Sequence, residues 1–202
     1  MDIRRDFYLE KLIKRKSNGL IKVITGIRRC GKSYLLNNIF YHHLLDSGVE
    51  ADHIIRFAFD SADDLYLIGE SLIQIEKEQR GVDPEKFMAY IRSKTTGEGI
   101  YYLLLDEIQM LDCFEAVLNG YLRKENIDVF VTGSNAKLLS KDIATEFAGR
   151  GDEIHMYPLS FAEFMSVYNG DKCTGLSEYM LYGGIPLVVL RDLSLIHISE
   201  PT

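Results

Sequence analysis

A glycine-rich loop near the start of the chain has the residue types and spacing of a phosphate-binding site. Residues 26–33 fit G-x-x-x-x-G-K-[ST] at every fixed position. In such a loop, backbone N–H groups wrap the anion, and the helix that follows directs its positive N-terminal end at it. We expect Lys32 to reach the β- and γ-phosphates of a nucleotide, and the hydroxyl of Ser33 to bind Mg²⁺. The predicted nucleotide-binding residues are Gly26, Ile27, Arg28, Arg29, Cys30, Gly31, Lys32, Ser33 and Tyr34.

The flanking sequence favours this interpretation over a simple turn with a surface lysine. A β-branched strand is expected at 20–25, before the loop, and a helix at 32–45 after it. Arg28 and Arg29 are expected either to contact phosphates or a neighbouring subunit, or to be solvated. Cys30 either has a lowered pKa beside this electropositive loop or simply fills the loop, and filling is the preferred interpretation.

An apolar strand that ends in two carboxylates supplies the second half of the predicted site. Residues 103–105 are all leucine and are followed by Asp106 and Glu107, the pattern of a Walker B motif. We expect Asp106 to hold Mg²⁺ and Glu107 to act as the catalytic base that polarises the attacking water, with Gln109 close enough to help. The alternative is a strand followed by an acidic turn. The position downstream of the phosphate loop favours the catalytic interpretation.

Two polar residues follow the strand expected at 128–133. Ser134 and Asn135 lie at the end of this strand, where ligands bind in doubly wound folds. Either side chain could hold the attacking water or sense the γ-phosphate. Both residue types also cap helices well, so capping of the next helix is the alternative.

One arginine and one aspartate are further candidates for the site. Arg150 is predicted either to stabilise charge on the γ-phosphate of an adjacent protomer or to pair with Asp152 or Glu153 in its own loop. Asp60 follows the second strand and is interpreted as a turn-forming aspartate.

Strands and helices alternate along the chain, which predicts a parallel sheet with helices on both faces. Strands are expected at 20–25, 54–59, 101–105, 128–133 and 153–157. Helices are expected at 3–15, 32–45, 72–78, 84–93, 113–124 and 137–147, and after a capping box that begins at Ser160. The predicted fold class is α/β: a P-loop NTPase with three α/β/α layers around a five-stranded parallel sheet.

Composition sets limits on the class of protein. The net charge is −7, which disfavours tight nonspecific DNA binding by this segment. No apolar stretch is long enough to span a bilayer, and the first residues do not form a secretory signal. Cys30, Cys113 and Cys173 are scattered without metal-ligand spacing, which favours reduced thiols in the cytoplasm.

The end of the chain does not match the rest. Residues 193–202 agree codon for codon with the translation of a transposase adapter used to prepare sequencing libraries. We interpret them as non-native, with a native amphipathic tail as the alternative. The expected organisation is an ATPase core at 1–165 and the adapter translation at 193–202.

The combined motifs resemble a large group of prokaryotic ATP-binding proteins of the AAA+ superfamily. The resemblance covers about residues 1–192 and rests on residues 24–33, 105–109, 131–134, 149–150, 157–164 and 178–186. It implies the sheet order 5-1-4-3-2, Mg²⁺-dependent ATP hydrolysis and association between protomers as a homo-oligomer or with a protein partner. It also implies a polar sensor role for Ser134 and an arginine-finger role for Arg150. A C-terminal domain follows the ATPase module in this group, so the resemblance implies that 166–192 is the start of a helical linker toward a missing C-terminal module.

Three functional hypotheses remain open. The first is an ATP hydrolase that drives or gates an attached module, and the second is a nucleotide-dependent binding switch with little turnover. The third is a DNA-linked motor that reaches nucleic acid only through the missing module. ATP is preferred over GTP because the N-K-x-D pattern that reads guanine is absent. Residues near Tyr8 and Leu9 are expected to line the base pocket.

Overall fold

The computed structural model describes residues 3–133 and 149–190. Three of the sequence predictions lie outside these residues: the helix at 137–147, the role of Ser134 with Asn135, and the segment 193–202. Among the described helices, none combines the length and the apolar character that crossing a membrane requires.

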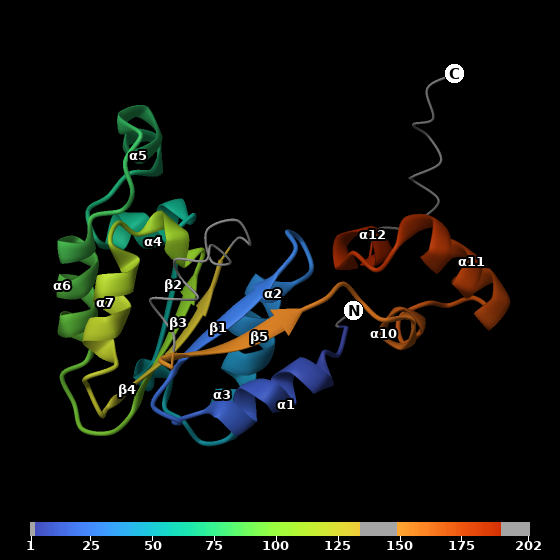
Figure 1. The fold of residues 1–202 in the computed structure, drawn as a ribbon, viewed down its shortest axis with the longest axis horizontal. Coiled ribbons are helices and arrows are strands. Elements are labelled where there is room, and N and C mark those ends of the chain that lie inside the picture. Colours follow the sequence, from blue (N-terminus) through green and yellow to red (C-terminus); the bar gives the residue numbers. More distant parts are fainter. Residues whose placement is uncertain (1–2, 134–148, 191–202) are drawn as a thin grey trace.

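The centre of the molecule is a sheet of five parallel strands in the order β2-β3-β4-β1-β5 (Figure 1). This is the predicted 5-1-4-3-2 order read from the opposite edge. The strands are β1 (Ile21–Gly26), β2 (Ile54–Ala58), β3 (Tyr101–Asp106), β4 (Ile127–Thr132) and β5 (Gly151–Met156). Every residue of β1 and β3 is buried, as expected for strands covered on both faces.

Helices cover the two faces of the sheet and form the three predicted layers (Figure 1). One face packs against α4 (Ala62–Leu67), α5 (Leu72–Glu78), α6 (Pro84–Lys94) and α7 (Phe114–Tyr121). The other face packs against α1 (Asp6–Arg15), α2 (Lys32–Tyr34), the π-helix η1 (Leu35–Phe40) and α3 (Tyr41–Asp46). Two short 3₁₀ helices are η2 (Ala51–His53) and η3 (Ile108–Met110).

Each face of the sheet has its own apolar core. Phe57, Phe59 and Phe87 form an aromatic cluster on the first face, and their rings are all fully buried. On the second face, Phe40 of η1 packs against Phe130 of β4 with ring centroids 4.6 Å apart. These two cores fix the distance of the helices from the sheet and so position the loops at the ends of its strands.

The helix after the phosphate loop differs in one respect from the prediction for 32–45. It runs from α2 to α3, but its middle is the π-helix η1, which has a wider turn than an α-helix. The backbone carbonyl of Asn37 in this segment accepts a hydrogen bond from Arg56 of β2 at 3.2 Å. That bond satisfies a carbonyl beside the sheet edge.

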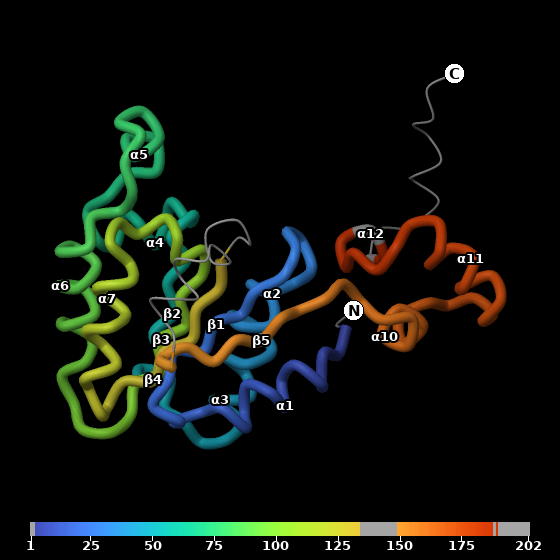
Figure 2. Tube along the Cα trace, in the orientation of Figure 1, coloured from blue at the N-terminus to red at the C-terminus, as the bar shows by residue number. Residues whose placement is uncertain are grey.

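A short helical segment leads away from the far end of β5. It contains α10 (Phe161–Met165), α11 (Lys172–Tyr182) and α12 (Pro186–Leu190), and it extends past the sheet on the side of α1 and α2 (Figures 1 and 2). The predicted capping box is present at the start of α10. Ser160 accepts from the backbone N–H of Glu163, whose carboxylate accepts from the backbone N–H of Ser160.

A buried ion pair joins the two central strands. The ammonium of Lys22 in β1 donates to the carboxylate of Asp128 in β4, and both side chains are almost fully buried. Burial lowers the pKa of Lys22, while the hydrogen bond to Asp128 opposes that shift. The other oxygen of Asp128 accepts from the backbone N–H of Ser17 at 2.8 Å. The pair therefore fixes β1 against β4 at the amino ends of the strands.

We expect Asp128→Asn to lower the free energy of unfolding by about 3–5 kcal/mol, because it leaves the Lys22 charge buried without its partner. Urea denaturation measures the change. Asp152→Asn is the matched control, since Asp152 pairs with Arg15 near the surface and should cost at most about 1 kcal/mol. An equal loss in the two variants would contradict the role given to the buried pair.

Candidate functional site

The phosphate-loop motif lies where the sequence predicts it, between the end of β1 and the start of α2. Gly26 has a φ of 143°, and a Cβ atom there would lie 2.2 Å from the carbonyl oxygen of Met156 in β5, so the position accepts only glycine. Gly31 has a φ of 99°. Lys32 folds back over the loop, and its Nζ donates to the carbonyls of Gly26 at 3.0 Å and Ile27 at 3.1 Å. The lysine is thus held inside the loop.

Asp106 joins the phosphate loop to the end of β3. Its Oδ1 accepts from the hydroxyl of Ser33 at 3.0 Å and from the hydroxyl of Thr132 at the end of β4. Its Oδ2 lies 3.4 Å from Nδ2 of Asn37. Burial raises the pKa of the Asp106 carboxyl, the hydrogen bonds from Thr132 and Ser33 oppose the shift, and the negative charge of Asp60 adds to it.

Glu107 is held in an unusual backbone conformation. Its φ is 53° and its ψ is 47°, the left-handed region that side-chain-bearing residues seldom adopt. Its backbone N–H donates to the hydroxyl of Thr132 at 3.2 Å, and its carboxylate accepts from the side-chain amide of Gln109. Backbone strain of this kind gathers at functional sites. Here it turns the carboxylate out of the strand and toward the cavity beside the phosphate loop.

Sequence reasoning missed two residues of this cluster. The sequence identifies Thr132 only as the end of a strand, yet it contacts both Asp106 and Glu107. Asn37 lies four residues after Ser33, one helical turn along, and so faces the same carboxylate. That spacing was the available signal for Asn37. For Thr132 the signal was a hydroxyl at the carboxyl end of a strand.

A cavity of about 580 Å³ adjoins the phosphate loop, a size typical of ligand sites. Glu107 and the phosphate loop with the start of its helix line one part of the cavity, through Arg28, Arg29, Cys30, Gly31, Lys32, Ser33 and Tyr34. The rest of the lining is mostly apolar and consists of Ile3, Arg5, Met156, Leu159, Pro186 and Leu187. Tyr8 and Leu9, near which the base pocket is expected, do not line this cavity themselves. Tyr8 lines a neighbouring groove, while Ile3 and Arg5, from the segment before α1, line the cavity.

The interior of the loop explains Cys30. The side chain is fully buried, and burial raises the pKa of its thiol despite the nearby charges of Lys32 and Arg5. The structure therefore supports the interpretation of Cys30 as loop filling. Arg28 and Arg29 are exposed and line the cavity.

Arg150 does not join this cluster in its own chain. It immediately precedes β5, so it lies at the amino ends of the strands, opposite the phosphate loop. Its guanidinium donates to Oδ1 of Asn119 at 3.3 Å. Asp152 and Glu153, the alternative partners, contact other residues: Asp152 pairs with Arg15 of α1, and Glu153 accepts from the hydroxyl of Thr25 in β1.

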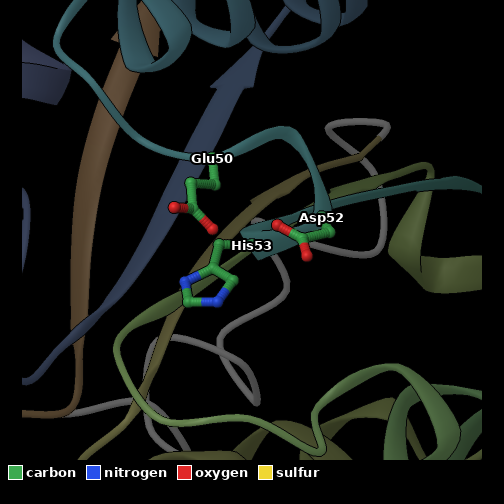
Figure 3. A group of neighbouring side chains, drawn as sticks. All are labelled: Glu50, Asp52 and His53. Atoms are coloured by element: carbon green, nitrogen blue, oxygen red, sulfur yellow. The ribbon is translucent and has the colours of Figure 1, made fainter.

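A second group of acidic and histidine side chains lies away from this cluster. Glu50, Asp52 and His53 come from the single turn around η2, and their potential ligand atoms lie within 4.8 Å of one another (Figure 3). The turn precedes β2 and therefore lies at the amino ends of the strands. Glu50 and Asp52 are exposed, so the group takes no part in the candidate site.

A phosphate loop after the first strand of an all-parallel sheet in this order defines a P-loop NTPase of the AAA+ class. The chain belongs to the family whose model is described as an AAA domain, which matches residues 18–165. Family and fold together support nucleotide binding and an ATPase at a general level.

Relatives and a solved structure agree with this assignment. The chain is 37% identical to an uncharacterised protein of Haemophilus influenzae, over 94% of this chain and 45% of that protein. It is 31% identical to the uncharacterised protein MJ1544 of Methanocaldococcus jannaschii, over 94% of this chain and 40% of that protein. The ORC1 protein of Aeropyrum pernix in complex with DNA shares the fold, with a TM-score of 0.51 at 14% identity, over 88% of this chain and 50% of that one. The chain thus spans less than half the length of these two curated relatives.

We expect Asp106→Asn to raise the melting temperature of the nucleotide-free protein by a few degrees at pH 7.5. The pKa of Asp106 is raised in the folded state, so the folded protein binds the proton more tightly than the unfolded chain. Ionised Asp106 therefore destabilises the fold above that pKa, and the cost disappears as pH falls through it. Calorimetry at pH 7.5 and at pH 5 should show the difference between variant and wild type shrinking in acid. Asp128→Asn should lower the melting temperature at both pH values, and the same sign for both variants would contradict this account.

Proposed function

We propose that this chain binds ATP and hydrolyses it with Mg²⁺, as the engine of a longer protein. The observation that carries the proposal is the hydrogen bond between Ser33 and Asp106 at 3.0 Å. It joins the phosphate loop to the second carboxylate strand at one edge of the sheet, where Glu107 also lies. The loop proposed to bind phosphate and Glu107, proposed to activate water, both line one cavity, which supports the proposal.

The residues around Asp106 fit a hard divalent cation. Ser33, Asp106 and Thr132 offer only oxygen atoms, which is the ligand type that Mg²⁺ prefers. The buried, ionisable carboxylate of Asp106 has no positively charged partner among the hydrogen bonds of the described residues, and a cation would offset the cost of its charge. Ser33 and Asp106 would hold the ion. When bound, Mg²⁺ neutralises phosphate charge and orients the β- and γ-phosphates.

The remaining residues have separate roles in the proposed reaction. The N–H groups of the loop and the ammonium of Lys32 bind the phosphates. Glu107 accepts a proton from the attacking water, and Gln109 holds the carboxylate of Glu107 by its side-chain amide. Thr132 fixes the backbone of Glu107 relative to Asp106. The apolar cavity wall, which includes Ile3, accommodates the adenine base.

The role proposed for Arg150 needs an assembly of protomers. Arg150 lies at the amino ends of the strands, away from the phosphate loop of its own chain, so we propose that it stabilises transition-state charge on the phosphates of a neighbouring copy. This role requires ATP hydrolysis to depend on protein concentration. We propose that Ser134 senses the γ-phosphate.

The engine drives or gates a C-terminal module in this proposal. The relatives are more than twice as long as the matched segment, and α10 to α12 form the start of the path out of the core (Figure 2). The ATPase core is placed at 1–165 and the linker at 166–192. Any contact with nucleic acid is assigned to the further module, because this segment carries a net charge of −7.

The alternative is a nucleotide-dependent switch with little turnover. The hydrogen bond from Gln109 to Glu107 favours it, because an amide bound to the carboxylate competes with the attacking water. In this case partners read the ATP-bound state itself.

Lys32→Ala in the full-length protein should abolish both ATP binding and hydrolysis, because it removes the charge that binds the β- and γ-phosphates. Glu107→Gln should keep ATP binding but lower turnover by about 10²–10⁴-fold, since the amide cannot accept the proton. Calorimetric binding of ATP with Mg²⁺ and release of inorganic phosphate measure the two properties separately.

Glu125→Gln is the matched control, because Glu125 is an exposed glutamate outside the cavity. Full hydrolysis by Glu107→Gln would disprove the catalytic-base assignment. ATP binding by the wild-type protein without any turnover would favour the switch.

A further inference from the structure

Arg5 is a buried arginine in the segment before α1. Only 4% of its side chain is exposed, although the neighbouring residues Arg4 and Asp6 are exposed to solvent. Burying a guanidinium is costly unless several acceptors receive it. Two carbonyl acceptors and one carboxylate ion-pair partner contact Arg5, and they come from three parts of the chain that are far apart in the sequence.

The first acceptor is a carbonyl of the phosphate loop, and the second is the carbonyl of the residue that follows β5. Nη1 of Arg5 lies 3.4 Å from the carbonyl oxygen of Cys30, and Nη2 donates to the carbonyl oxygen of Tyr157 at 2.7 Å. The guanidinium also lies 4.7 Å from the centre of the Tyr8 ring, whose hydroxyl accepts from the backbone N–H of Tyr157. Arg5 and Tyr8 thus hold both polar backbone groups of Tyr157.

The third contact of Arg5 is an ion pair at the start of α10. Nε of Arg5 lies 3.0 Å from Oε1 of Glu163, while Oε2 of the same carboxylate accepts from the backbone N–H and the hydroxyl of Ser160. One carboxylate therefore both caps α10 and pairs with Arg5. Movement of the guanidinium must move the first turn of α10 or break the ion pair.

The backbone of the connection between β5 and α10 is held in place by further contacts. The backbone N–H of Leu159 donates to the carbonyl oxygen of Gly184 at 2.6 Å, and its own carbonyl accepts from the hydroxyl of Tyr179 at 2.7 Å. A Cβ atom on Gly184 would lie 2.2 Å from the carbonyl oxygen of Leu159. The connection is therefore fastened to α11 and to the turn before α12 as well as to Arg5.

We propose that Arg5 is a positioning residue that couples the phosphate loop to the helical segment α10–α12. The loop binds phosphate through its N–H groups, so a nucleotide shifts the peptide units whose carbonyls point away from it. The carbonyl of Cys30 transmits that shift to the planar guanidinium, which moves its contacts with Tyr157 and Glu163 together. This inference rests on the proposed ATP binding and assigns the route by which binding reaches the rest of the protein.

Hydrogen–deuterium exchange of the full-length protein tests the coupling, with the β,γ-imido analogue of ATP and Mg²⁺ as the probe. In the wild type, the analogue should slow amide exchange in α10–α12 by about tenfold, the value for one charged hydrogen-bond contact. In Glu163→Gln, whose side chain lies outside the nucleotide cavity, the analogue should bind within about threefold of the wild-type affinity, but exchange in α10–α12 should no longer respond to it.

The variants separate coupling from simple support of the fold. Glu163→Gln removes the charge but keeps a residue that completes the capping box, so α10 still begins at Ser160. Arg4→Gln is the matched control, because Arg4 is exposed, and it should respond like the wild type. A structural role alone would speed exchange in Glu163→Gln by the same factor with and without the analogue.

Each outcome decides between the claims. Two outcomes would contradict the coupling through Arg5 while leaving ATP binding intact. In the first, the analogue binds and exchange in α10–α12 slows equally in Glu163→Gln and the wild type. In the second, the analogue binds and exchange in α10–α12 of the wild type does not change. If the analogue does not bind the wild type, the proposed function is wrong and the coupling with it.

Discussion

Parallel pairing of β1 between β4 and β5 is the constraint on which the rest of the structure depends. It brings the carboxyl ends of strands that are far apart in the sequence to one edge of the sheet, and with them Gly26, Asp106 and Thr132. The approach of Gly26 to Met156 leaves no room for a side chain. The same contacts between strands therefore determine both the conformation of the phosphate loop and the position of its polar residues. A sheet packed less closely would neither form the loop nor bring Ser33 to Asp106.

Local sequence patterns were enough to predict most of the fold. The apolar strands, the phosphate-loop motif and the capping box at Ser160 are each encoded within a few neighbouring residues, so the sequence predicts them directly. Thr132 and Asn37 were missed because their roles depend on which strands lie side by side, and that information is not local. The partner of Asp152 is not local either, because Arg15 comes from α1, which packs beside β5.

The candidate site is kept at a cost in stability. Asp106 carries a buried carboxyl with a raised pKa, and Glu107 has a left-handed backbone. The amino ends of the strands show the opposite arrangement, where Asp128 meets the ammonium of Lys22 and a backbone N–H. The groups at the amino ends of the strands thus stabilise the fold, and those at the carboxyl ends keep polar groups available for a ligand. This division is common in α/β proteins, whose ligands bind at the carboxyl ends of strands.

The π-helix η1 has a consequence for how the length of this chain can vary. A π-helical turn holds one residue more than an α-helical turn, so the extra residue is absorbed without rotating the helix beyond it. Losing one residue within Leu35–Phe40 would convert the segment to a regular α-helix and leave Leu44 facing the sheet. The same loss within α3 would rotate the subsequent side chains by about 100°. We therefore expect the helix to accommodate a deletion within η1 better than one within α3.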